Sequence, residues 1–300
     1  MDHTAWAGRI VVAIDGSVSA LNAARWAAAE AVARGRGLTL AHALVPPVMG
    51  GGFSIGLPPR LDILDTMREE AMTELGKIAD GLEGDDITIE IQIGSASALM
   101  IQASESADLL VLGSRGHGGF KGLLVGSVGT QVASHAQCPT VILREQPRAS
   151  AHQVVVGIDG SPHSMAAIAF AFDEASRHGW ELIAIHAWDV PAYDLIITPQ
   201  GAVPFPLADV ADSEIRLAAE VLAGFRTDYP DVTVQERLVR APAVQAILEA
   251  SVDAALIVVG TRGHGPAVGA VLGSVSNGLL HRATVPVAVV PLTDEEDDVA

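Results

Sequence analysis

The sequence predicts an α/β fold of two tandem domains, each an open five-stranded parallel sheet with helices on both faces. Short runs rich in Val, Ile and Leu alternate with longer helical segments, which is typical of βαβ units. The same order of elements occurs twice: Asp15 and Asp159 lie 144 residues apart, and Pro139 and Pro286 lie 147 apart. Hydrophobic residues make up 49% of the chain and aromatic residues only 4%, so the expected core consists of aliphatic strands buried on both faces.

The repeat also predicts the domain boundaries. Residues 1–146 are expected to form the first domain and residues 151–293 the second. A polar junction between Glu145 and Ala151 contains a proline and reads as a linker. Residues 294–300 are predicted to be an acidic tail, because five consecutive Asp and Glu residues begin it.

The first half contains clear signals for each element. Gly35 is placed to end an Ala-rich helix, and residues 87–93 alternate as a half-exposed strand does. Residues 45–59 are rich in Pro and Gly and are predicted to be a loop. The predicted strands cover residues 9–14, 38–43, 87–93, 109–112 and 140–143, and the predicted helices cover about 19–34, 61–82, 96–106 and a segment from 127.

The second half repeats this order. Ser161 and Pro162 are a helix cap followed by proline at the first helical position, and Gly179 is placed to end that helix. Residues 193–206 are predicted to be a second long loop. Apolar runs predict strands at 154–158, 256–259 and 285–290.

One glycine-rich stretch stands in each half, between an apolar run and a helix. Two residues separate its first two glycines, nine separate the second from the third, and a serine follows at once. A strand, a glycine loop and a helix N-terminus together favour phosphate binding, because glycine lets the backbone approach a ligand and free amides point at the anion. Alternatively, the two glycine stretches could be only tight turns, but the same spacing in both halves favours phosphate binding. The two stretches are Gly113, Gly116, Gly126 and Ser127 in the first half, and Gly260, Gly263, Gly273 and Ser274 in the second.

This motif resembles the ATP-binding signature of the universal stress proteins (the UspA-like family), and the resemblance covers about residues 8–144 and 152–291. It implies the strand order 3-2-1-4-5, with an adenine nucleotide between the ends of strands one and four. The aspartates would contact adenosine, and the glycine motif would hold ribose and phosphates. The implied ligand-binding residues are Ala13, Asp15, Ala43, Gly113, Ser114, Arg115, Gly116, Gly126, Ser127 and Val128, and then Gly157, Asp159, Ala187, Gly260, Thr261, Arg262, Gly263, Gly273, Ser274 and Val275.

Some of these residues also suit a structural role. Asp15 and Asp159 fit the cap or turn of the helix that follows each of them. Ser127 and Ser274 fit helix N-caps, which is compatible with binding phosphate. Val18 stands where the second half has Pro162, and the long loops differ between the halves, so the equivalence of the two sites is open.

The resemblance implies a stress-response or signalling protein whose conformation or assembly depends on bound nucleotide. Two ATP molecules per chain are expected, accompanied by Mg²⁺. We predict no catalytic residue and no protein ligand to a metal, so at most weak ATP hydrolysis is expected. The chain contains no Walker A motif, which excludes a P-loop NTPase. Two alternatives stay open: a slow ATPase or phosphotransferase, and an interaction module whose nucleotide is structural.

The charge and the composition limit which partners and which cellular location can be expected. The formal net charge is −18, and only two residues are lysines, which argues against nucleic acid as a partner. No apolar run approaches the ~18 residues that span a bilayer, so no membrane insertion is expected. No signal peptide is visible, and the single Cys138 fits a reducing compartment, so a cytoplasmic location is expected. The resemblance further implies a homodimer, an unknown protein partner, and an intramolecular pseudo-dimer of the two halves.

Overall fold

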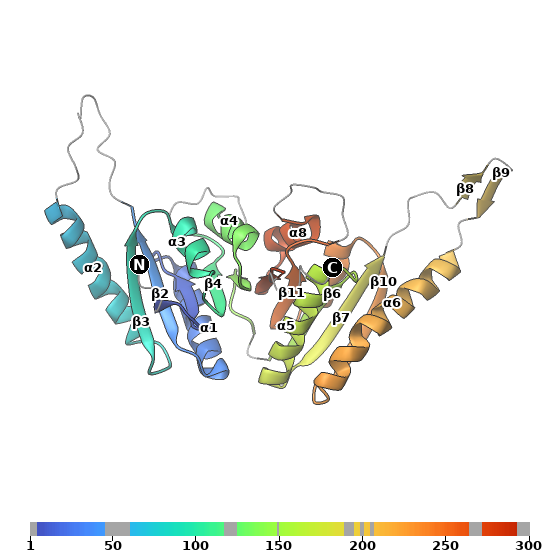
Figure 1. Ribbon diagram of the computed structural model, residues 1–300, viewed down its shortest axis with the longest axis horizontal. Helices are drawn as coiled ribbons and strands as arrows, with labels where there is room; N and C mark the ends of the chain where they lie inside the picture. The colour runs from blue at the N-terminus through green and yellow to red at the C-terminus, as the bar shows by residue number, and fades with distance from the viewer. Residues whose placement is uncertain are drawn as a thin grey trace, which may run out of the picture. The chain divides into compact units, whose positions relative to one another are not determined.

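The computed structural model describes residues 5–45, 61–116, 125–148, 150–188, 195–198, 201–204, 207–263 and 272–292. The chain forms two compact units, Met1–Gln146 and Pro147–Ala300 (Figure 1). Each unit is built on its own five parallel strands. No described helix combines the length and the hydrophobicity that crossing a lipid bilayer demands.

The first unit alternates strands and helices along its described residues. Its apolar runs become strands, and the Ala-rich and amphipathic segments become helices, as the sequence predicts. In chain order the elements are β1 (Ile10–Ala13), α1 (Val18–Arg34), β2 (Leu38–Leu44), α2 (Leu61–Ala79), β3 (Ile87–Ile93), α3 (Ala96–Ala103), β4 (Leu109–Gly113), α4 (Ser127–His135) and β5 (Thr140–Leu143).

The strands of the first unit lie in the order β3-β2-β1-β4-β5, which is the predicted 3-2-1-4-5 order. All four pairings are parallel, and Ile10 of β1 pairs with Leu38 of β2 on one side and with Leu109 of β4 on the other. These central residues are fully buried, which explains why they are aliphatic rather than alternating with polar residues.

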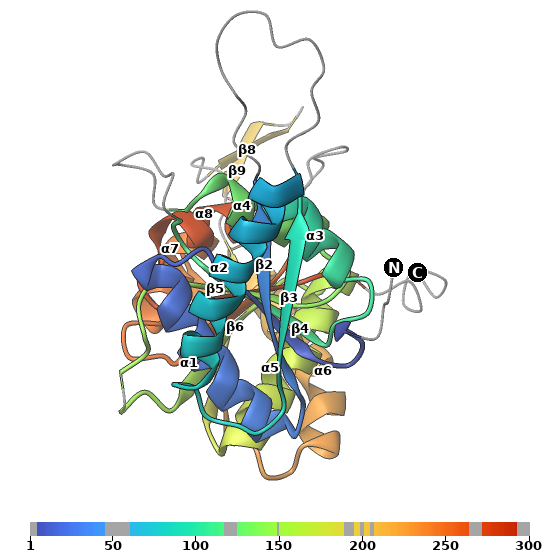
Figure 2. The same cartoon turned by 90° about the vertical axis from the view of Figure 1, so that its left-hand side faces the viewer.

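Helices cover both faces of this sheet. Right-handed crossovers place α1 and α2 on one face and α3 and α4 on the other. The packing agrees, because α1 contacts β1 and β4, α2 contacts β2 and β3, and α3 and α4 contact each other. Figure 2 shows α2 running beside β2 and β3.

Local sequence signals set the ends of α1. The N-cap Ser17 accepts a hydrogen bond from the Ala20 amide at 3.2 Å. At the other end Gly35 has φ 61°, in the left-handed region, and its amide bonds back to the last helical turn.

The second unit repeats the arrangement, with strand order β10-β7-β6-β11-β12. Ser161 caps its first helix, Pro162 follows it, and Gly179 ends that helix at φ 63°. The elements are β6 (Gln153–Ile158), α5 (Pro162–His178), β7 (Glu181–Trp188), β8 (Leu195–Thr198), β9 (Gly201–Pro204), α6 (Leu207–Asp228), β10 (Val234–Arg240), α7 (Ala243–Ala250), β11 (Leu256–Gly260), α8 (Ser274–Arg282) and β12 (Val287–Val290).

Strands β8 and β9 correct the prediction of a loop over residues 193–206. They form a separate antiparallel pair in which Ile196 pairs with Val203 and Thr198 with Gly201. The segment Leu-Ile-Ile-Thr is rich in β-branched residues, which favour strands, and the flanking prolines hid this signal.

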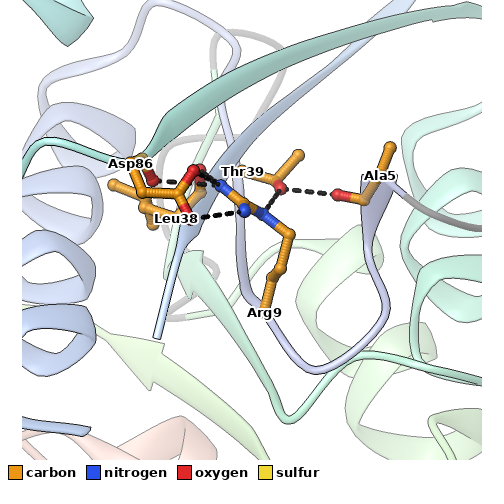
Figure 3. A network of polar contacts seen from close by, with 5 residues as sticks. All are labelled: Ala5, Arg9, Leu38, Thr39 and Asp86. Carbon is orange, nitrogen blue, oxygen red and sulfur yellow. Dashed lines mark hydrogen bonds and ion pairs between the residues drawn. The ribbon is translucent and has the colours of Figure 1, made fainter. Parts of the chain in front are cut away.

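A half-buried arginine joins the amino-terminal ends of β2 and β3 (Figure 3). Arg9 donates two hydrogen bonds to the Asp86 carboxylate, at 2.8 and 2.9 Å, and one to the Leu38 carbonyl at 2.9 Å. Its Nε donates to Thr39 Oγ1 at 3.0 Å. The hydrogen bond from Arg9 holds the pKa of Asp86 below its ordinary value.

Candidate functional site

A cavity of about 340 Å³ lies at the carboxyl ends of the strands of the first unit. It opens between β1 and β4, where the winding of the sheet reverses, which is the usual place for a ligand in an open α/β sheet. All ten residues that the sequence predicted for the first domain line it, namely Ala13, Asp15, Ala43, Gly113, Ser114, Arg115, Gly116, Gly126, Ser127 and Val128.

Sequence reasoning missed one wall of this cavity. Ala96, Leu99 and Met100 of α3 line it, and so does Ala41 of β2. The three helical residues have the i, i+3, i+4 spacing of one helix face, which was a detectable signal. The same spacing describes an ordinary core helix, so the pattern alone did not mark a ligand wall.

One end of the cavity is lined by backbone amides. The N-cap of α4 is Gly126, which has φ −73° and offers no side chain to cap the helix. The Gly126 amide donates to the Ser114 carbonyl at 2.8 Å, and the first backbone bond of the helix runs from Thr130 to Gly126 at 3.2 Å. The amides of residues 127–129 therefore point toward an external acceptor, and the helix dipole adds partial positive charge there. This end suits an anion.

Asp15 also lines the cavity, next to the glycine stretch. Its Oδ1 accepts a hydrogen bond from the Ser17 amide at 3.0 Å, which fixes the turn between β1 and α1. The Ser17 hydroxyl donates to the Arg115 carbonyl at 3.2 Å and so ties this turn to the glycine stretch. Gly116 lies directly against Oδ2 of Asp15, where a Cβ atom would collide with it.

The first glycine of the motif has a packing role. A Cβ on Gly113 would lie 2.7 Å from the backbone carbon of Ser19 and 2.9 Å from the Ala20 amide nitrogen. Gly113 thus lets the first turn of α1 approach β4, and this approach sets the distance between Asp15 and the glycine stretch.

Ser114 presents a hydroxyl without a partner. The residue is 2% exposed and lines the cavity, and its Oγ has no hydrogen-bond partner among the described residues. A buried hydroxyl without a partner is costly, so Ser114 is a candidate to bind a ligand.

The predicted residues of the second unit lie at equivalent places in its fold. Gly157 is in β6, Ala187 in β7, and Gly273 is the N-cap of α8 with φ −66° and no capping side chain. Asp159 follows β6, and its Oδ1 accepts from the amide and the hydroxyl of Ser161, at 2.9 and 2.6 Å. The others follow the same scheme: Gly260 ends β11, Thr261, Arg262 and Gly263 come next, and Ser274 and Val275 begin α8.

Gly260 and Gly263 repeat the contacts of their counterparts. A Cβ on Gly260 would lie 2.6 Å from the carbonyl oxygen of His163 in α5, and one on Gly263 would collide with Oδ2 of Asp159. Residues 117–124 and 264–271, within the two glycine stretches, lie outside the described residues.

Comparisons with known proteins agree with this architecture. A model of the universal stress protein family matches residues 7–144 and 151–291. A universal stress protein of Mycolicibacterium smegmatis is 36% identical over 293 residues, which cover 94% of this chain and 96% of that protein. One of Mycobacterium tuberculosis is 36% identical over 294 residues, with coverage of 93% and 96%. The crystal structure of a universal stress protein from Archaeoglobus fulgidus is similar in fold, with a TM-score of 0.68 at 23% identity, over 96% of this chain and 97% of that one.

Proposed function

The chain belongs to the universal stress protein family. We propose that it is an ATP-binding stress-response protein whose conformation or assembly changes with bound nucleotide. Each of the two domains carries one ATP site, formed by the predicted residues. The site residues act in binding, and none is assigned a catalytic role.

The polarity of the cavity in the first domain carries this proposal. Free amides at the start of α4 suit the phosphates. Other lining residues are apolar, among them Ala43 of β2 and Leu99 and Met100 of α3, and they suit a planar base. Asp15 also lines the cavity, and its carboxylate is a hydrogen-bond acceptor. A nucleotide has this combination of an anionic end, a hydroxyl-bearing sugar and a flat apolar end.

The available hydrogen bonds are sufficient for useful affinity. A hydrogen bond to a charged group contributes about 1.5–3 kcal/mol net. Three or four such bonds from the amides of residues 127–129 and the Ser127 hydroxyl reach the ~8 kcal/mol of micromolar binding. The net charge of −18 opposes a polyphosphate ligand, so we propose that Mg²⁺ enters with ATP and neutralises part of its charge.

We further propose that the protein acts in the cytoplasm as a homodimer with a protein partner. The acidic composition and the buried thiol of Cys138 support the location, and the family resemblance alone supports the dimer. Light scattering after size exclusion, with and without ATP, measures the assembly. A mass that stays monomeric in both conditions would remove the dimer from the proposal.

The proposal is tested by purifying the full chain without added nucleotide, denaturing it and identifying any released nucleotide by chromatography and mass spectrometry. Calorimetric titration with Mg-ATP then gives the stoichiometry, which we expect to be two per chain. Ser127→Asp and Ser274→Asp each place a carboxylate at an exposed helix start that tolerates it, so each should remove one site. The matched controls are Ser127→Asn and Ser274→Asn. Absence of released nucleotide together with no binding in the titration would overturn the proposal.

A further inference from the structure

The two domains differ under the apolar part of the proposed sites. In the first domain Ala13 of β1 and Ala41 of β2 are neighbours in the sheet register, and both line the cavity. The equivalent neighbours in the second domain are Gly157 of β6 and Ile185 of β7. Ile185 is 1% exposed, so its larger side chain lies inside the fold.

The helix above these strands differs as well. Met100 of α3 lies nine residues before the start of β4, and Ile247 of α7 lies nine residues before the start of β11. The Cδ1 atom of Ile247 is 3.0 Å from the place that a Cβ on Gly157 would occupy. Ile247 therefore packs down onto β6, and glycine at position 157 provides the room that it needs.

The neighbouring helix residue changes in the opposite direction. Ala246 of α7 stands where α3 has Leu99. Compared with the first domain, the second therefore has a larger side chain on the strand, Ile185, and a smaller one at this helix position. In the first domain Ala13 carries a Cβ and an open cavity of about 340 Å³ still lies over it. A flat group that rests on Ala13 and Ala41 cannot take the same position over Gly157 and Ile185.

The helix starts that would hold phosphate have similar backbone geometry in the two domains. Gly126 and Gly273 are both N-caps with similar backbone angles, φ −73° and −66°, and neither has a capping side chain. Ser127 and Ser274 follow them at exposed positions. The exchange of Ala41 for Ile185 thus lies in the part of the site that would receive the nucleoside.

We propose that the first site binds ATP by its nucleoside and its phosphates, whereas the second site binds it mainly by its phosphates. Ala41 and Ile185 determine this difference. The inference rests on the proposed function and adds a difference in selectivity between the two sites. The first site is selective for the nucleoside, and the second binds triphosphates in general. Less apolar surface of the ligand is buried in the second site, so the nucleoside contributes less affinity there.

The test measures each site alone in the full chain, with Ser274→Asp isolating the first and Ser127→Asp isolating the second. Each variant is titrated with Mg-ATP and with Mg-bound inorganic triphosphate. We expect ATP to bind the first site at least about tenfold more tightly than triphosphate, and the second site within about threefold, as a difference in buried apolar area implies.

Exchanging the strand residues should exchange the behaviour. Ala41→Ile should lower the ATP affinity of the first site by about tenfold and leave its triphosphate affinity unchanged. Ile185→Ala should raise the ATP affinity of the second site, and thermal melting checks that this variant folds. Ile247→Met is a second variant. It introduces the residue that the first domain has at the equivalent position, Met100, and it preserves the core because the side-chain volume is conserved.

The possible outcomes distinguish a failure of this inference from a failure of the proposed function. Equal preference for ATP over triphosphate at both sites would overturn this inference and leave the proposed function intact. Absence of binding of either ligand at both sites would overturn the proposed function and this inference together.

Discussion

Gly116 faces the carboxylate of Asp15 so closely that any side chain at position 116 would collide with Oδ2. The other carboxylate oxygen accepts a hydrogen bond from the Ser17 amide at 3.0 Å, so turning Asp15 away would cost that bond. The described positive-φ glycines do not include Gly116, and its requirement for glycine is therefore one of space. Gly263 and Asp159 repeat this relationship in the second domain.

Gly116→Ala should therefore weaken ATP binding at the first site. The added methyl group displaces Asp15 from its position next to the glycine stretch, and we expect the affinity to fall by about tenfold, the equivalent of 1.4 kcal/mol. Calorimetric titration in the Ser274→Asp background measures the first site alone. The control is Gly76→Ala, because a Cβ on Gly76 in α2 meets no atom within 4 Å. If both variants bind ATP as the parent does, the close approach of Gly116 to Asp15 has no role in ATP binding.

Ser114→Ala tests the unpartnered hydroxyl. Its Oγ has no partner among the described residues, so its removal should leave the free energy of unfolding of the empty protein unchanged or slightly higher. ATP binding should weaken by the ~0.5–1.5 kcal/mol of one hydrogen bond. Urea denaturation and titration measure the two quantities separately.

A suitable control for Ser114 is Ser134 of α4. Its hydroxyl donates to the Thr130 carbonyl at 2.6 Å, so Ser134→Ala removes a hydrogen bond that lies within the helix. The control should lower stability slightly and leave ATP affinity unaltered. A Ser114→Ala protein that loses stability but keeps its affinity would assign this serine to the fold alone.

The sequence was sufficient to predict most helices and strands, because the signals for these elements are local and redundant. Gly35 and Gly179 mark helix ends, and both have left-handed backbone angles in the structure. The strand order depends on long-range packing and came from the family resemblance. The hairpin of β8 and β9 was missed because prolines beside Leu195–Thr198 favoured a loop.

The candidate site was predictable to a different extent at its two ends. The glycine motif has a fixed spacing, so the predicted residues of the first domain all line one cavity. Leu99 and Met100 carry no motif, because apolar residues at helical spacing serve a core and a ligand wall equally well. The importance of Ile247 depends on its Cδ1 atom lying 3.0 Å from the place that a Cβ on Gly157 would occupy, which no sequence pattern encodes.

Asp86→Asn should lower stability in a pH-dependent way. Arg9 holds the pKa of Asp86 below the ordinary value of 3.8, so the charged pair contributes stability at neutral pH and loses it as pH falls through the folded-state pKa. Because the Asp86 side chain is 68% exposed, we expect no more than about 1 kcal/mol at pH 7. Urea denaturation at pH 7 and at about pH 3 compares the variant with the parent. A stability difference that is equal at both pH values would contradict a role for the charge.

Gly37→Ala tests the hydrogen-bond network of Arg9 by crowding its guanidinium. A Cβ on Gly37 would overlap the Arg9 guanidinium, so the variant should displace that side chain and lower stability. Once Arg9→Ala has removed the guanidinium, the same substitution should cost much less. The double-mutant cycle measures this coupling, and additive effects would show that Gly37 and Arg9 act independently.

Cys138 should be chemically silent in the folded protein. Burial, with a smaller effect from the negative charge of Asp108, raises the pKa of its thiol to about 12, and the side chain is 7% exposed. The reactive thiolate is therefore scarce at pH 8, and a thiol reagent should modify Cys138 only after unfolding in denaturant. The raised pKa also predicts that the neutral thiol contributes stability up to about pH 9, and that this contribution is lost as pH rises further. A Cys138→Ala variant should lack this alkaline loss, which urea denaturation at pH 8 and pH 10 measures. Rapid modification in native buffer would mean that the segment before β5 opens readily, because a thiol at this depth reacts only when the surrounding chain moves away.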